Sequence, residues 1–332
     1  CYLFSPYLPK LFMDDIKKRK DTESPSLRPD RMHAFLHLFL GVIFFLGALI
    51  VCSSLSILVC SSIVYGDFSG FSQAAILVED LKNHSLILNV FVFISSPLPL
   101  ILAAILTTRF VKARTKDYLL LHKPLDLKWF FYSLLFVFIC IPLMGFMLDI
   151  NNLIDFSQWP DLHAWLKQKE GESNQIYESL IGDRSMLSFI ASVFFMALLP
   201  AIAEEIFFRG FLMNIFNGIF NNMHVAILVT AFIFSAMHLQ FMKFVPMFFL
   251  ATVFGYAVYW TGSLFTSILA HFINNSLAVI QLFYFSDGDY SKSLEQSQTL
   301  GLPFNMILIF LALLLFVLIQ RKSSTKTTCF YV

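Results

Sequence analysis

The sequence predicts an all-α, polytopic membrane protein, a bundle of about eight transmembrane helices. Its 332 residues are 58% hydrophobic and only 14% charged, with a mean hydropathy of +0.73, whereas an ordinary soluble domain is roughly 25% charged. Apolar windows of about 20 residues, enough to cross a bilayer, recur along the chain. They fall near residues 34–64, 85–108, 129–148, 186–206, 224–240, 241–260, 264–285 and 303–320.

The first window is interpreted as a span because its apolar run is about 30 residues long and lacks the small-residue cleavage motif of a signal peptide. Met13 heads a basic stretch before it and is a candidate start residue. We expect three parts in the chain. They are a basic N-terminal segment (1–32), one membrane domain (33–320) with a motif core at 186–285, and a basic tail (321–332).

Two features lie between the first spans and the motif core. The run Ser95-Ser96-Pro97-Leu98-Pro99 predicts a kink in the second span, because proline removes a helix hydrogen bond. In the connection 149–185, apolar residues recur at loosely helical spacing beside charges. This pattern fits a helix along the membrane surface, and a solvated connector is the alternative.

Loop charges predict the orientation of the chain. Residues 109–128 hold six basic residues against two acidic ones, and both chain ends are also basic. Residues 149–185 instead hold seven acidic residues against three basic ones. The positive-inside rule therefore places both termini in the cytoplasm. We expect a multi-pass protein of a bacterial cytoplasmic membrane.

Composition argues against several classes of protein. The formal net charge is +1, and the basic residues gather at span ends instead of forming one face, so a nucleic-acid partner is not expected. The five cysteines are scattered, with no CxxC pair, which supports neither a disulfide framework nor a thiolate zinc site. Membrane lipids and a peptide or membrane-associated protein substrate are the expected partners. The oligomeric state is not predicted.

A charged cluster interrupts the fourth apolar window. Glu204, Glu205 and Arg209 are the only charged residues between positions 186 and 220. Because an ionised group in hydrocarbon costs several kcal/mol, roughly 3 on insertion scales, it persists mainly where it is paired, hydrated or used. Arg209 lies one helical turn after Glu205, so the sequence predicts that this pair is structural and that Glu204 is free to react.

Two histidines fall within later spans. On a helix, residues four apart share a face, which pairs Phe234 with His238 and His271 with Asn275. Taken singly, such residues are usually interhelical hydrogen-bonding groups, worth on the order of 1 kcal/mol. Together with the glutamates they contain the parts of a hydrolytic site. Glu204 would activate a water, His238 would share the proton, and His271 with Asn275 would hold the oxyanion.

Three motifs occur complete and in order along the chain: EExxxR, FxxxH and HxxxN. They are EEIFFR (204–209), FSAMH (234–238) and HFINN (271–275). In this respect the chain resembles the CPBP intramembrane endopeptidases, the CAAX prenyl protease and bacteriocin-processing (Abi-type) family. The resemblance implies an all-helical membrane endopeptidase that uses Glu204 as the base. It implies supporting roles for Glu205, Arg209 and Phe234.

The need for a metal stays open at this point. One glutamate and two histidines match the composition of a catalytic zinc site, and the ligands would then be Glu204, His238 and His271. The HExxH pair of helical zinc proteases is absent, and the resemblance favours a metal-free glutamate mechanism. Two other functions are alternatives, a catalytically silent scaffold or immunity protein and a proton-coupled transporter. A transporter would be expected to show repeat symmetry, and we find none.

Overall fold

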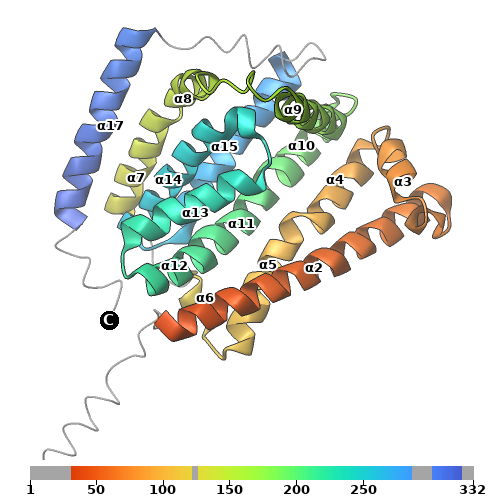
Figure 1. The fold of residues 1–332 in the computed structure, drawn as a ribbon, viewed down its shortest axis with the longest axis horizontal. Helices are drawn as coiled ribbons and strands as arrows, with labels where there is room; N and C mark the ends of the chain where they lie inside the picture. The colour runs from red at the N-terminus through yellow and green to blue at the C-terminus, as the bar shows by residue number, and fades with distance from the viewer. Residues whose placement is uncertain (1–30, 122–125, 286–300, 324–332) are drawn as a thin grey trace, which may run out of the picture.

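The computed structural model describes residues 31–121, 126–285 and 301–323, and all regular structure in these ranges is helical. The predicted fold class is therefore confirmed (Figure 1). The tails of the predicted three-part division lie largely outside the described residues. The helices are α2 (Arg31–Tyr65), α3 (Ala74–Leu81), α4 (Ser85–Ser95), α5 (Pro97–Phe110), α6 (Thr115–Tyr118), α7 (Leu127–Cys140), α8 (Leu143–Asn152), α9 (Pro160–Ile181), α10 (Met186–Ser192), α11 (Leu199–Glu205), α12 (Met213–Phe220), α13 (Met223–Met237), α14 (Phe244–Thr261), α15 (Leu264–Phe285) and α17 (Leu302–Ser323), with short 3₁₀ turns η1 (Ser69–Phe71) and η4 (Phe241–Lys243).

The described chain crosses a membrane several times. Six helical segments are long and apolar enough to span a bilayer, and the bent pair α7 and α8 makes a seventh. Every predicted window forms helix, but α13 has 15 residues, about 22 Å at 1.5 Å per residue, less than the roughly 30 Å of hydrocarbon. Asn222 caps its start by accepting from two backbone amides, and Leu239 ends it with a φ of 55°.

Proline shapes two of the spans. The second span is interrupted where the sequence predicts a kink, since α4 ends at Ser95 and α5 begins at Pro97. A second bend was not predicted: α7 and α8 meet at 46°, where Pro142 interrupts the third span. Hydropathy alone does not register such bends, because proline neither shortens nor polarises the apolar run.

The long connection after α8 contains a helix. Residues 160–181 form α9, with Leu166, Leu180 and Ile181 buried against the bundle. This decides in favour of helix over an irregular connector. In Figure 1, α9 lies at the end of the bundle where α8 ends and α10 begins.

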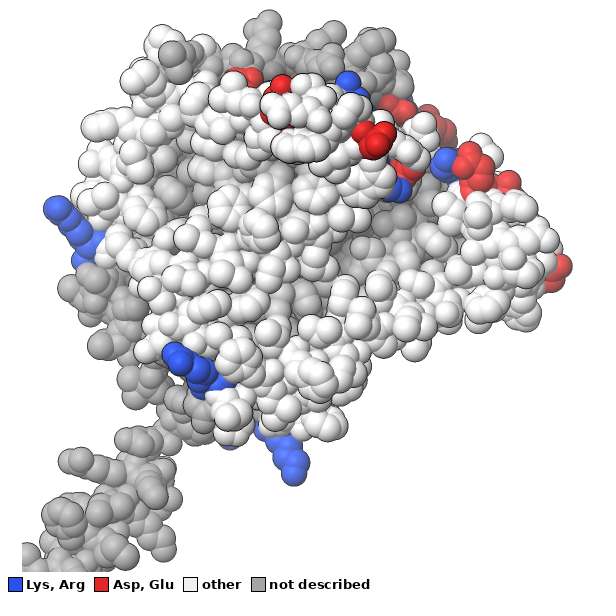
Figure 2. Space-filling model, viewed as in Figure 1, with Lys and Arg blue, Asp and Glu red and all other residues white. Residues whose placement is uncertain are grey.

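The two ends of the bundle carry opposite charge. Asp and Glu outnumber Lys and Arg around α3 and α9, where a few basic residues lie among them, whereas Lys and Arg predominate at the far end, near the starts of α2 and α7 and the end of α5 (Figure 2). We call these the acidic end and the basic end. At the acidic end, Glu79, Asp80, Asp155, Asp161, Glu170, Glu172, Glu178 and Asp183 stand against Lys82, Lys167, Lys169, Arg184 and Lys243. At the basic end, Arg31, Arg109, Lys112, Arg114, Lys116 and Lys128 stand against Asp117 and Asp126.

Candidate active site

The predicted ion pair lies in the middle of the bundle. Arg209 Nη1 donates to Glu205 Oε1 at 2.7 Å, and the two side chains are 2% and 0% exposed. Arg209 Nη2 donates to the carbonyl oxygen of Ala251 on α14 at 2.9 Å. The guanidinium also lies over the rings of Phe234 and Phe254, with its central carbon 4.9 and 5.6 Å from their centroids, within the range of a cation–π contact. Arg209 therefore ties three spans together.

His271 contacts both glutamates. Its Nδ1 lies 2.8 Å from Glu205 Oε1, and its Nε2 lies 3.7 Å from Glu204 Oε2. Since Glu205 already accepts from a guanidinium, it is a carboxylate and Nδ1 must carry the proton. The Glu205–His271 hydrogen bond was not predicted, because helical spacing pairs Glu205 only with Arg209.

His238 ends α13 and faces the same site. Its Nδ1 lies 2.8 Å from the carbonyl oxygen of Phe234, which can only accept, so Nδ1 is the protonated nitrogen of the ring. The Phe234 ring lies between the two histidines, with centroids 4.5 Å from His238 and 6.1 Å from His271. In a neutral His238, Nε2 is thus left as a proton acceptor.

The motif residues open onto one cavity of about 360 Å³. Glu204, with 17% of its side chain exposed, lines it, whereas Glu205 is fully buried behind. Asn275 also lines the cavity, and its Oδ1 accepts from Asn274 Nδ2 at 3.4 Å, so its own amide protons can be donated elsewhere. Of the two glutamates, only Glu204 therefore reaches the cavity. The motif residues on the wall are Glu204, Phe234, His238, His271 and Asn275.

The helix that carries the glutamates is widened on both sides of them. Its π-helical segments, η2 (Val193–Leu198) and η3 (Ile206–Leu212), flank α11. The first ends two residues before Pro200 and so accommodates the ring and missing N–H of the proline. Single π turns often occur at functional sites, where they redirect side chains within a helix.

The geometry does not assemble a metal site. Within the ranges that the structure describes, no group of three His, Cys, Asp or Glu side chains could hold a metal ion. The donor set Glu204, His238 and His271 thus does not fit a metal in this arrangement, and we derive no step through one.

Several residues other than the motif-defining ones also line the cavity. Asn89, Ser96, Tyr177, Gln240 and Asn274 add polar groups to the wall. Asn89 is 3% exposed. An asparagine within an apolar span is the one sequence signal that could have identified it. The others needed the tertiary arrangement, since nothing in their local sequence distinguishes them.

These features define a class, a multi-pass helical membrane protein with a buried Glu–Arg–His cluster beside a polar cavity. Residues 186–277 match the family described as Type II CAAX prenyl endopeptidase Rce1-like. This segment runs from α10 into α15 and contains all three motifs. The family resemblance predicted from the motifs is thus confirmed over this segment.

A curated relative matches about a third of the chain. The uncharacterized protein YpbD of Bacillus subtilis (strain 168) is 28% identical over 122 residues. The match covers 36% of this chain and 58% of that protein, less than two thirds of its length. Solved structures give no significant match.

Proposed function

We propose that this protein is an intramembrane endopeptidase that hydrolyses a peptide bond with a water activated by Glu204. The observation that carries the proposal is the unequal environment of two adjacent glutamates. Glu205 is fully buried and paired with Arg209 and His271, whereas Glu204 borders the cavity. A carboxylate that is not needed for charge balance and that meets a polar cavity is suited to general-base work.

In the proposed reaction, Glu204 takes a proton from a water in the cavity while the oxygen attacks the scissile carbonyl carbon. The C–N bond then breaks, and the leaving amine receives that proton. His238 serves as the relay, because its Nδ1–H is held by the Phe234 carbonyl and Nε2 remains free to accept and return a proton.

Two donors would stabilise the oxyanion. Asn275 can give an amide proton, because only its oxygen is used by Asn274. His271 also lines the cavity, and its Nε2 can donate when the ring is an imidazolium. Removing one such donor typically costs 10²–10³-fold in turnover, about 2.7–4 kcal/mol.

The test compares the membrane proteomes of cells expressing the wild type and Glu204→Gln. The amide keeps the shape of the side chain but cannot act as a base, so we expect an uncleaved polypeptide to accumulate in the variant. Glu172→Gln on the exposed surface of α9 is the matched control and should leave processing unchanged. Cleavage of the identified substrate by purified, reconstituted Glu204→Gln at the wild-type rate would refute the proposal.

The same variants separate the alternatives. A scaffold or immunity protein would keep its effect on cells in Glu204→Gln. A proton-coupled transporter would show uptake in liposomes that contain no cleavable peptide. We further propose that the basic end faces the cytoplasm of a bacterial cell, and that lipids and a peptide or membrane-associated protein are the partners.

A further inference from the structure

We infer that the cavity receives its substrate from the acidic end of the bundle, so that the substrate is a polypeptide segment presented on that side of the membrane. This inference rests on the proposed function. The supporting observation is which part of each helix lines the cavity. On α15 the wall runs from His271 to Leu282, about 16 Å at 1.5 Å per residue, away from the turn that joins α15 to α14.

The other helices contribute from the same half of the bundle. On α13 and the turn after it, the wall begins at Phe234 and reaches Gln240, and on α14 it occupies only the first half, Met247 to Phe254. Tyr177 of α9, which lies at the acidic end, also lines it. Gln240 Nε2 donates to the Tyr177 hydroxyl at 3.5 Å. The cavity thus extends from Glu204 to the underside of α9.

Toward the basic end the site is closed by packed side chains. Phe208 and Phe211, one to two turns after Glu204, are 2% and 1% exposed. The chain around α6 packs beneath them: Asn214 Nδ2 donates to the Tyr118 carbonyl oxygen at 2.9 Å. Gly210 approaches the same segment so closely that a Cβ there would lie 3.3 Å from the carbonyl oxygen of Leu119. A peptide from the basic end would have to displace this layer.

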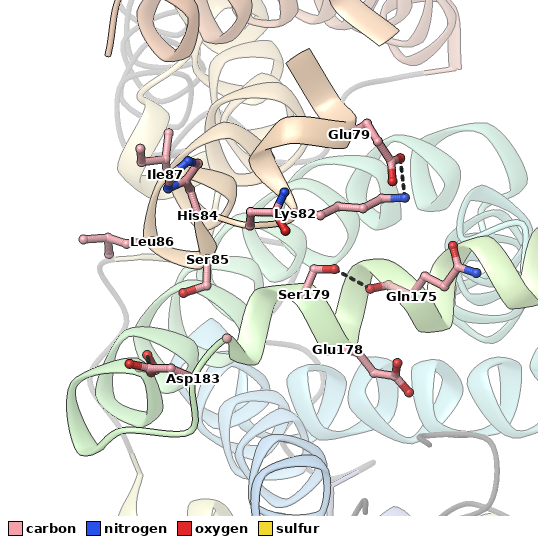
Figure 3. Close-up of a pocket in the computed structure, with 13 residues that line it drawn as sticks. Glu79, Lys82, His84, Ser85, Leu86, Ile87, Gln175, Glu178, Ser179 and Asp183 are labelled. Carbon is pink, nitrogen blue, oxygen red and sulfur yellow. Dashed lines mark hydrogen bonds and ion pairs between the residues drawn. The ribbon is translucent and has the colours of Figure 1, made fainter. Parts of the chain in front are cut away.

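The acidic end is instead hollowed next to the cavity. A second cavity of about 870 Å³ lies between the α3–α4 turn, which bears Lys82 and His84, and the C-terminal part of α9 (Figure 3). Its wall is polar and charged. Both cavities are lined by α4 and α9. Asn89, whose Nδ2 donates to the Leu180 carbonyl oxygen at 2.9 Å, lines the inner one, and Ser85 and Ser179 line the outer one. A polar hollow therefore adjoins the inner cavity at the acidic end.

The residues that line the inner cavity indicate which kind of substrate segment can enter it. Among the described residues that line the inner cavity, Glu204 is the only Asp, Glu, Lys or Arg. Burying a charged group without a partner is costly, so the segment that enters is an uncharged stretch of polypeptide. By the positive-inside rule the acidic end faces away from the cytoplasm, which makes the substrate extracytoplasmic. A lipid-anchored C-terminus on the cytoplasmic face would not reach this opening.

Thiol accessibility tests the inference without any need for activity. Met247→Cys and Ala278→Cys place a thiol on the cavity wall. Gly171→Cys marks the acidic end, since a Cβ there meets nothing within 4 Å, and Arg114→Cys marks the basic end, its side chain being 90% exposed. Each is made in a chain whose Cys1 and Cys329 are serine; Cys52, Cys60 and Cys140 are buried, and the background without an added cysteine reports their labelling.

A membrane-impermeant, cationic methanethiosulfonate is applied to intact cells and to inverted vesicles. We expect both cavity cysteines to label with Gly171→Cys in intact cells, and Arg114→Cys to label only in inverted vesicles. Labelling of the cavity from the Arg114 side would overturn the inference, as would labelling by a permeant reagent alone. Repeating the assay in Glu204→Gln separates it from the proposed function, because accessibility should persist when cleavage is lost.

Discussion

Replacing Arg209 with methionine should destabilise the protein more than any other single change in the charged cluster. The side chains have similar reach, but methionine removes the 2.7 Å ion pair to Glu205 and the 2.9 Å hydrogen bond to Ala251. Glu205 is then a fully buried carboxylate whose remaining hydrogen-bond partner is His271. Removing one partner of a buried pair costs about 3–5 kcal/mol.

Thermal unfolding of the purified protein in detergent measures this loss, and two further variants test its cause. Arg209→Lys keeps the charge but cannot reach both acceptors with a planar fork, so it should lose about 1–3 kcal/mol. Arg209→Met combined with Glu205→Leu removes both charges and should recover much of the stability. If Arg209→Met cost under about 1 kcal/mol, or the double variant were no better than the single one, the argument from an uncompensated buried charge would be wrong.

Three other predictions concern the scaffold around the site. Gly255→Ala should destabilise the α13–α14 contact by about 1–3 kcal/mol, because the new Cβ would lie 2.7 Å from Ile227 Cγ2; unfolding of Gly255→Ala with and without Ile227→Ala tests whether that contact is the cause. Asn222→Ala removes the cap of α13 and should cost about 1 kcal/mol in the same assay, whereas Asn222→Ser should cost little. The hydroxyl of Ser188 and nearby amides lower the pKa of Asp183, so its carboxylate stabilises the start of α10 above the unfolded pKa and that contribution is lost as pH falls through the lowered folded value. The protection factors of the backbone amides there, which correct for the intrinsic pH dependence of exchange, should fall with acid in the wild type and lose this dependence in Asp183→Asn.

Much of the fold could be predicted because hydrocarbon imposes a length and a composition on each span. The local geometry could not. The bend at Pro142 and the two π-helical segments leave the apolar runs intact, and the short α13 is set by a cap at Asn222 and a left-handed Leu239. Both depend on backbone hydrogen bonds that hydropathy does not encode.

Prediction of the site from the sequence is limited in the same way. The motif residues were predicted because polar groups four apart share a helix face and few others occur in these spans. The bond from His271 to Glu205 depends on the register of α15 against α11, and the contributions of Asn89 and Tyr177 come from helices outside the motifs. Sequence periodicity gives the face of one helix, whereas a wall made by several helices depends on how they pack.

The charges in the cluster predict that substituting His271 and substituting His238 will lower stability by different amounts. Two carboxylates face one guanidinium, so the cluster carries one net negative charge when His271 is neutral and none when it is an imidazolium. His271→Gln should therefore cost stability as well as turnover, about 1.5–3 kcal/mol for a hydrogen bond to a charged group.

His238 instead bonds a carbonyl of its own helix, so His238→Gln should cost at most about 0.5–1.5 kcal/mol while abolishing the proton relay. Thermal unfolding and turnover, measured on both variants, distinguish the two roles. Equal losses of stability would show that His271 does not balance the glutamates, and the reason for two histidines in these spans would then lie in the reaction alone.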